Sequence, residues 1–179
     1  MKRFASFILF SILGWKMDTN FPINIKKYVV IAAPHTSWVD FPIAILSRMS
    51  SGIMIHYIGK DSLFRAPFGF FFRALGGTPV DRSKKNKLVD AIIDIFNSKT
   101  EFRLALSPEG TRKKVERWKT GFYFIAKGAN VPIVMVTLDF GNKQIKISEP
   151  YHTTDDMDRD FQVFSSFYEN VKGKNPELS

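Results

Sequence analysis

The sequence predicts an α/β protein, in which one domain is built on a mixed, partly parallel sheet flanked by helices. Short runs rich in β-branched residues alternate with stretches of helical periodicity, which is typical of βαβ units. The chain has 179 residues, enough for one domain with its own hydrophobic core. No internal repeat, low-complexity linker or change of composition marks a second domain.

The first half of the chain predicts three strands and a helix. The apolar run YVVIAA at residues 28–33 predicts a strand. Residues 37–50 show helical spacing, and the run IMIHYI at residues 53–58 predicts the next strand. A short strand at residues 78–80 then leads into a charged pair.

The second half continues the alternation. Residues 84–98 carry apolar side chains at helical spacing, namely Leu88, Val89, Ile92, Ile93 and Phe96. The stretch KQIKIS at residues 143–148 alternates polar and apolar residues, as an edge strand does. The other elements expected here are helices at residues 121–129 and 155–171, and strands at residues 102–106 and 131–140.

The composition is basic and rich in phenylalanine. The net charge is +9 and there are 18 Phe. A basic surface attracts nucleic acid, anionic lipid headgroups or phosphorylated small molecules. Aromatic residues among Lys and Arg suit a membrane interface, although they also stack on single-stranded bases. The chain has no Cys and only three His, which excludes disulfides and a cysteine nucleophile and argues against a metal site.

The N-terminus carries a short apolar run behind two basic residues, Lys2 and Arg3. It resembles a signal peptide but is not followed by a small-x-small cleavage site. It is also shorter than the roughly 20 residues that a membrane-spanning helix needs. We expect an amphipathic helix in the membrane interface, with Trp15 and Lys16 at the headgroups. The alternatives are a terminal helix packed on the protein's own core and an uncleaved signal.

A phenylalanine-rich segment, FRAPFGFFFRALGG, occupies residues 64–77. As a helix, residues 68–75 would be apolar nearly all round. Such a helix must be buried in protein or in lipid. The interpretations that remain open are a buried core helix, a second membrane-facing element, and the wall of an acyl-chain tunnel.

A histidine and an aspartate follow the first predicted strand, in APHTSWVDF (residues 33–41). Residues five apart do not share a helix face, so His35 and Asp40 meet only if His35 precedes the helix. Pro34 favours this because it biases the preceding residue towards extended backbone. Asp40 then accepts a hydrogen bond from one ring nitrogen, and the other is free to take a proton from a hydroxyl. The alternative is structural, since Ser37 and Asp40 have the spacing of a capping box.

Two basic turns are expected at other strand ends. SPEGTRKK, residues 107–114, follows a predicted strand, and open α/β sheets hold ligands at such ends. Arg112 and the two lysines after it can grip a phosphate. GGTPVDR, residues 76–82, similarly presents Arg82 after a tight turn. The alternatives are a solvated basic loop and a surface turn with a local charge pair.

Four blocks together resemble the glycerolipid acyltransferases, a family typified by 1-acyl-sn-glycerol-3-phosphate acyltransferase (lysophosphatidic acid acyltransferase). HTSWVD, residues 35–40, resembles the family's H-x-S-x-x-D motif. Residues 77–82 resemble the second motif, a glycine followed five residues later by arginine. PEGTR, residues 108–112, matches the third, and VPIVMV, residues 131–136, resembles the fourth, V-P-I-[VI]-P-V. The blocks occur in the family's order, so the resemblance covers most of the chain.

The resemblance implies direct transfer of an acyl group from a thioester to a hydroxyl. His35 would be the general base and Asp40 would orient it, with no acyl-enzyme. The chain agrees, because it has no Cys and no G-x-S-x-G elbow. The implied donor is acyl-CoA or acyl carrier protein, with no further cofactor and no metal. The implied acceptor site comprises Gly77, Arg82, Glu109, Gly110, Thr111 and Arg112, with the arginines on a phosphate.

The family is membrane-associated, which implies a peripheral or monotopic position on an anionic, cytoplasmic membrane face. We therefore expect residues 1–17 to be a membrane-interface helix, residues 18–172 the acyltransferase domain and residues 173–179 a polar tail. The implied acceptor is a lysophospholipid, first of all 1-acylglycerol-3-phosphate, which would give phosphatidate.

Three departures from the family pattern bear on the acceptor. Pro34 stands where the family commonly has Asn, Ser107 replaces Phe, and Met135 replaces Pro. They leave room for another lyso-lipid acceptor. A hydrolase that uses water in place of the acceptor is a further alternative, as is a non-catalytic basic protein that binds membranes or nucleic acid. Nucleic acid is not the expected partner, because no nucleic-acid-binding signature is present.

Overall fold

The structure, a computed structural model, describes residues 1–18, 21–80 and 85–178. Its strands are β1 (Lys16–Met17), β2 (Lys27–Ala33), β3 (His56–Lys60), β4 (Gly77–Val80), β5 (Phe102–Leu106), β6 (Ile133–Asp139) and β7 (Gln144–Ile147). The α-helices are α1 (Lys2–Ser6), α2 (Asp40–Ser51), α3 (Gly69–Ala74), α4 (Lys85–Ser98), α5 (Gly121–Gly128) and α6 (Met157–Tyr168). A π-helical segment η1 (Phe7–Ile12) continues α1, and short 3-10 helices form η2 (Asp61–Phe64) and η3 (Pro176–Leu178).

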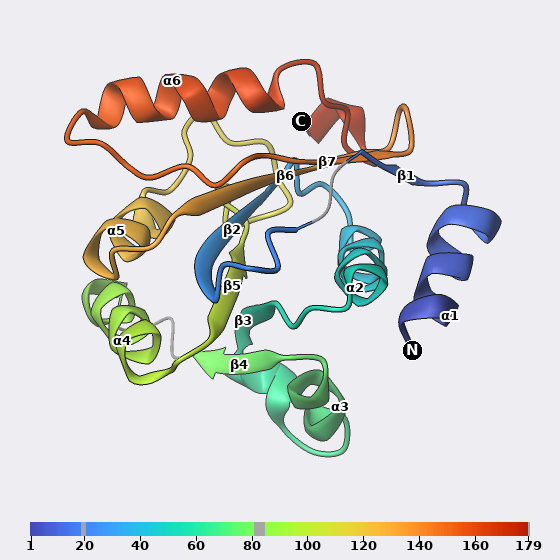
Figure 1. The fold of residues 1–179 in the computed structure, drawn as a ribbon, viewed down its shortest axis with the longest axis horizontal. Coiled ribbons are helices and arrows are strands. Elements are labelled where there is room, and N and C mark those ends of the chain that lie inside the picture. Colours follow the sequence, from blue (N-terminus) through green and yellow to red (C-terminus); the bar gives the residue numbers. More distant parts are fainter. Residues whose placement is uncertain (19–20, 81–84, 179) are drawn as a thin grey trace.

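The strands form one sheet in the order β1-β7-β6-β2-β5-β3-β4. Among these described strands every neighbouring pair is parallel except β6 and β7, which are antiparallel. Helices α4, α5 and α6 lie on one side of the sheet, and α1 and α2 on the other (Figure 1). This confirms the predicted fold class, a single-domain mixed sheet flanked by helices.

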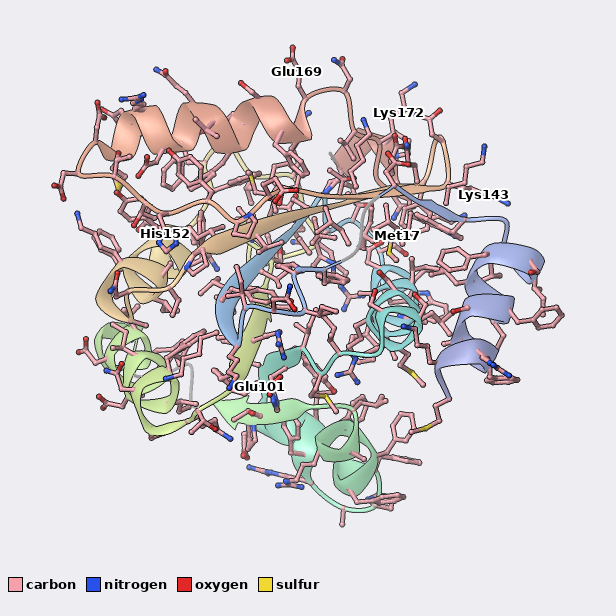
Figure 2. All side chains as sticks on the ribbon, viewed as in Figure 1. Met17, Glu101, Lys143, His152, Glu169 and Lys172 are labelled. Carbon is pink, nitrogen blue, oxygen red and sulfur yellow. The ribbon has the colours of Figure 1, made fainter. Side chains whose placement is uncertain are left out.

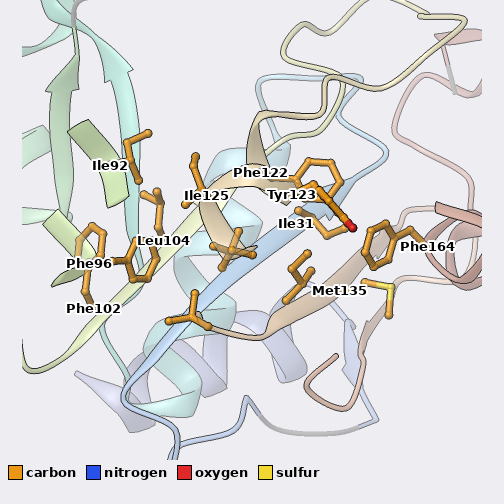
Figure 3. Close-up of a cluster of buried hydrophobic side chains, with 14 residues drawn as sticks. Ile31, Ile92, Phe96, Phe102, Leu104, Phe122, Tyr123, Ile125, Met135 and Phe164 are labelled. Atoms are coloured by element: carbon orange, nitrogen blue, oxygen red, sulfur yellow. The ribbon is translucent and has the colours of Figure 1, made fainter. Parts of the chain in front are cut away.

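Strands β2 and β6 form the centre of the core because both of their faces are covered. Along β2, Val29 and Ile31 enter the cluster under α4, α5 and α6, where Phe164 also lies (Figure 3). Tyr28 and Val30 point the other way, into the cluster under α1 and α2. A side-chain period of two therefore divides each continuously apolar strand between two cores.

Several predicted boundaries differ from the structure, and two of them have a clear physical cause. Helix α2 begins at Asp40, not at residue 37, because the preceding residues form a turn around the Asp40 side chain. Strand β3 begins at His56, not at residue 53. Gly52 ends α2 in the left-handed conformation, and the backbone N–H of Ile53 still bonds Arg48, so pairing with β5 starts only at His56.

The phenylalanine-rich segment is not a buried core helix. Phe68, Phe70 and Phe71 on and beside α3 are 68%, 75% and 51% exposed. The buried alternative is therefore wrong. Only the back of α3 is tightly packed, where a side chain at Gly69 would collide with the backbone of Phe64.

The N-terminal helix is apolar on two sides. Ala5 and Leu9 are fully buried, and α1 packs along α2. Phe4, Phe7 and Ile12 face outward and are 67%, 58% and 63% exposed. The segment therefore both packs on the domain and presents apolar side chains to its surroundings. No helix within the described residues has the length and apolar character needed to cross a bilayer.

Met135 stands where the family motif has proline, and Ser148, directly after β7, compensates for this difference. Unlike proline, Met135 has a backbone N–H, and it donates to the hydroxyl of Ser148 at 2.9 Å. The N–H of Ser148 in turn donates to the carbonyl of Met135 at 2.9 Å. The hydroxyl of Ser148 thus accepts the backbone N–H that Met135, unlike proline, places in a buried strand.

We expect Ser148→Ala to lower the free energy of unfolding by about 1–3 kcal/mol, because the N–H of Met135 loses its acceptor. Urea denaturation measures this change. Ser165→Ala is the matched control, since its hydroxyl bonds the carbonyl of Phe161 on the exposed side of α6. The control should change stability by less than about 0.5 kcal/mol. Equal losses of stability in Ser148→Ala and Ser165→Ala would contradict the role assigned to Ser148.

Candidate active site

The site is set by two parallel neighbours in the sheet. Strands β2 and β5 pair in the register that places Ile31 beside Leu106. Their carboxyl ends therefore lie at the same edge, which is where open α/β sheets hold ligands. The loop that follows β2, residues 34–39, is called the histidine loop below. The loop that follows β5, residues 107–120, is called the PEGTR loop.

Asp40 holds the histidine loop with one oxygen. Its Oδ2 lies 2.9 Å from Nδ1 of His35. The same oxygen accepts the backbone N–H groups of Thr36 and Ser37, each at 2.9 Å. Asp40 is 3% exposed, whereas about a third of the His35 side chain is accessible. A carboxylate can only accept here, so Nδ1 is the donor, and in the neutral imidazole Nε2 then carries the lone pair.

The structural and catalytic interpretations of Asp40 therefore coexist. Its bond from the N–H of Ser37 is one half of a capping box. The other half is altered, since the hydroxyl of Ser37 accepts from Val39 at 3.3 Å. The carboxylate that closes the turn before α2 is also the one that contacts His35.

Glu109 lies against the histidine loop. Its Oε2 accepts the backbone N–H of His35 at 2.8 Å and the hydroxyl of Ser107 at 3.1 Å. The residue is 8% exposed, and burial raises the pKa of its carboxyl, against the lowering effect of these hydrogen bonds. The sequence resemblance placed Glu109 with the acceptor. In the structure its contacts join the PEGTR loop to His35, and Ser107 supports them.

The basic part of the PEGTR loop is open to solvent. Arg112 is exposed, and Thr111 accepts the backbone N–H of Lys113 at 3.3 Å. Gly110 has φ +65°, a left-handed conformation that favours glycine, and the loop folds back so that the side chain of Lys119 lies over it. The loop thus presents its basic side chains beyond a tight turn at the mouth of the site.

Of the two motif residues of the second block, the glycine lies within the described part of the chain. Gly77 begins β4, and a Cβ there would lie 2.7 Å from both Phe64 and the carbonyl of Phe72. Close packing therefore requires glycine at this position. Arg82 lies outside the described residues.

Two residues from the C-terminal part of the chain make contacts that nothing in the sequence signals. Asn175 donates its backbone N–H to the hydroxyl of Thr36 at 3.1 Å and its side-chain amide to the carbonyl of Thr36 at 2.9 Å. The hydroxyl of Tyr168 donates to the carbonyl of Ile31 at 2.6 Å and accepts from Val136 at 3.2 Å. Burial raises the pKa of Tyr168 well above its usual value. These residues support the histidine loop and the strand before it.

The other two histidines lie elsewhere. His56 stacks on Phe102 with ring centroids 4.9 Å apart, and burial lowers its pKa. His152 is exposed in the connection before α6 (Figure 2).

A model of the family described as Acyltransferase matches residues 17–139, which include all four blocks. This chain belongs to the acyltransferase family. The match confirms the family that the motifs predicted, and the protein is an acyltransferase.

A solved structure shares the fold. The 1-acyl-sn-glycerophosphate (LPA) acyltransferase PlsC from Thermotoga maritima superposes with a TM-score of 0.63 at 20% sequence identity. The alignment covers 93% of this chain and 74% of that one. A search by sequence among curated proteins found no match.

We expect Glu109→Ala to lower kcat about ten- to a hundredfold, because the N–H of His35 loses its buried acceptor. Glu109→Gln keeps an oxygen in place and should retain most of the activity. Glu116→Ala, an exposed glutamate of the same loop, is the control and should leave kcat unchanged. Initial rates at saturating substrate measure the effect, with thermal unfolding to show that each variant is folded. Wild-type kcat in Glu109→Ala would rule out a positioning role.

Proposed function

We propose that this acyltransferase moves a fatty acyl group from acyl-CoA or acyl carrier protein to the hydroxyl of a lysophospholipid. The proposed acceptor is 1-acylglycerol-3-phosphate, with phosphatidate as product. The observation that carries the proposal is the His35–Asp40 pair, held beside the PEGTR loop at the carboxyl edge of the sheet. The fold shared with a 1-acyl-sn-glycerophosphate acyltransferase supports the choice of acceptor.

The proposed chemistry is one proton transfer coupled to one acyl transfer. Nε2 of His35 takes the proton of the acceptor hydroxyl as its oxygen attacks the thioester carbon. Collapse of the tetrahedral intermediate forms the ester and breaks the C–S bond. The thiolate leaves and takes the proton back from His35. Asp40 keeps the imidazole in the required tautomer and stabilises the imidazolium that forms. The sequence of steps needs no cofactor and no metal.

The acceptor phosphate is assigned to the basic side of the PEGTR loop. Arg112, Lys113 and Lys114 are exposed in sequence after a turn whose first part contacts His35. An arginine can bind a phosphate bidentately, and lysines add charge. Arg82 completes this proposed site on grounds of sequence, with Gly77, Gly110 and Thr111 shaping its turns.

The proposed position is peripheral, on an anionic membrane face on the cytoplasmic side, and exposed aromatic and aliphatic side chains support the membrane contact. The outward surface of α1 and η1 carries Phe4, Phe7 and Ile12. Trp38, three residues after His35, is 69% exposed. Apolar side chains of this kind insert into the interface, and a net charge of +9 adds attraction to anionic lipid.

We expect His35→Ala to lower acyl transfer at least about a hundredfold, because the general base is lost. The measurement is thiol release from palmitoyl-CoA with and without lysophosphatidate, with the lipid product identified by mass spectrometry. His152→Ala is the control, an exposed histidine that should leave the rate unchanged.

The same assay separates the alternatives. Release that does not depend on the acceptor would identify a hydrolase. Acyl carrier protein and other lyso-lipids are tested in parallel as donor and acceptors. A wild-type rate in His35→Ala would refute the mechanism.

We expect the double change Phe4→Ser and Phe7→Ser to weaken binding to vesicles that contain phosphatidylglycerol at least about tenfold, because each exposed ring contributes burial energy. Co-sedimentation measures the bound fraction. Phe124→Ser is the control, an exposed phenylalanine of α5 on the opposite side of the molecule from α1 (Figure 1). If Phe124→Ser weakens vesicle binding as much as the double change, the prediction that α1 contacts the membrane is wrong.

A further inference from the structure

A pocket lies on the far side of the histidine loop from the PEGTR loop. It has a volume of about 360 Å³, within the range of small-molecule sites. Its apolar wall consists of Leu13, Trp15, Val39, Ile43 and Phe140. The ring of Trp15 packs edge-on against Phe140 with centroids 4.9 Å apart. The wall therefore joins the end of η1, the first turn of α2 and the turn after β6.

Three lysines border this pocket, and it is called the lysine pocket below. They are Lys143, Lys172 and Lys174, and all three are exposed. Figure 2 shows Lys143 and Lys172 in the same upper-right region of the molecule. None of the ion pairs among the described residues involves these lysines. The nearby carboxylate of Asp139 is already occupied by the N–H groups of its own turn.

The lysines are held by the fold and do not stand on a loose tail. Lys143 Nζ donates to the carbonyl of Leu13 at 3.1 Å, and Lys174 Nζ lies 5.9 Å from the centre of the Phe140 ring. The carbonyl of Lys172 accepts the N–H of Phe140 at 2.9 Å. The turn after β6 and the C-terminal segment are thus joined around the pocket.

The wall of the lysine pocket includes residues beside the catalytic pair. Val39 immediately precedes Asp40, and Ile43 lies one turn further along α2. Asn175, between two lining residues of the C-terminal segment, donates twice to Thr36, the neighbour of His35. The pocket is therefore bordered both by the histidine loop and by the lysines.

The order of the strands separates this pocket from the other basic site. His35 follows β2, which lies between β6 and β5. The PEGTR loop follows β5 on one side. The lysine pocket lies beside β6, β7 and β1 on the other side. In the proposed reaction, the acyl donor and the acceptor each carry a phosphate, and both must reach His35. Two cationic sites, one on each side of His35, meet this requirement.

We propose that the lysine pocket binds the phosphopantetheine arm of the acyl donor, an inference that rests on the proposed function. This arm has its thioester at one end and a phosphate at the other, with a neutral chain between them. Its phosphate suits the lysines, and its neutral chain suits the apolar wall that leads to Val39 of the histidine loop. The PEGTR loop, on the other side of β2, is assigned to the acceptor phosphate, which leaves the lysine pocket for the donor. Coenzyme A and acyl carrier protein share the arm, so the pocket serves either donor.

The test is direct binding, which needs no turnover. Trp15 lies in the pocket wall, so its fluorescence reports occupancy, and Trp15→Phe assigns the signal. We expect coenzyme A and phosphopantetheine to bind, and pantetheine, which lacks the phosphate, to bind at least about tenfold more weakly. Equal binding of pantetheine and phosphopantetheine would overturn the proposal.

Charge reversal tests the lysines. Lys172→Glu with Lys174→Glu should weaken coenzyme A binding and raise KM for palmitoyl-CoA at least about tenfold, with KM for the acceptor unchanged. Lys26→Glu with Lys99→Glu changes the net charge equally at two exposed positions and should have no such effect. Lys172→Arg with Lys174→Arg keeps both positive charges and should bind coenzyme A as the unchanged protein does. A rise in KM for the acceptor alone, or equal effects of both charge reversals, would contradict the assignment.

The two proposals fail differently. Binding of coenzyme A that depends on the lysines, without acyl transfer, would refute the proposed function and support the pocket. Acyl transfer with an unchanged KM for the donor in the lysine variant would support the function and refute the pocket. Donor kinetics with acyl carrier protein, measured on the same variants, identify which source of the arm the protein uses.

Discussion

The site depends on the single oxygen Oδ2 of Asp40. A buried carboxylate is costly unless it is hydrogen-bonded, and this oxygen accepts from Nδ1 of His35 and from the backbone of Thr36 and Ser37. Those three bonds fix the imidazole and the loop together. They also explain why α2 starts only at Asp40, since the preceding N–H groups are directed at its side chain. The helix start and the proposed base are consequences of the same electrostatic requirement.

The parallel sheet brings the supporting residues to this carboxylate from distant parts of the chain. Glu109 reaches the backbone of His35 because β2 and β5 are neighbours in register. Tyr168 bonds the backbone of both β2 and β6. Asn175 bonds Thr36 from the C-terminal segment. A base that must stay aligned is thus held by strands and buried hydrogen bonds, while the basic PEGTR loop remains open to substrate.

The distribution of charge and apolar surface suits a reaction between anionic amphiphiles. The central strands are buried on both faces, so the positive charges lie around them, on loops at the carboxyl edge and on the C-terminal segment. The proposed acceptor and donor phosphates fall on opposite sides of His35, which keeps two like-charged ligands apart. The exposed apolar residues of α1 and η1 border the same region, because Leu13 at the end of η1 is part of the pocket wall.

The sequence by itself determined the alternation of strands and helices and the family, because these depend on local periodicity and on short motifs. It also identified His35 and Asp40 as partners, since five residues of turn suffice to join them. Only the tertiary structure decided that Phe68, Phe70 and Phe71 are exposed, that Glu109 contacts His35, and that Asn175 contacts the histidine loop. Burial depends on which elements cover a surface. Hydrogen bonds between residues 74 or 139 positions apart leave no periodic trace in the chain.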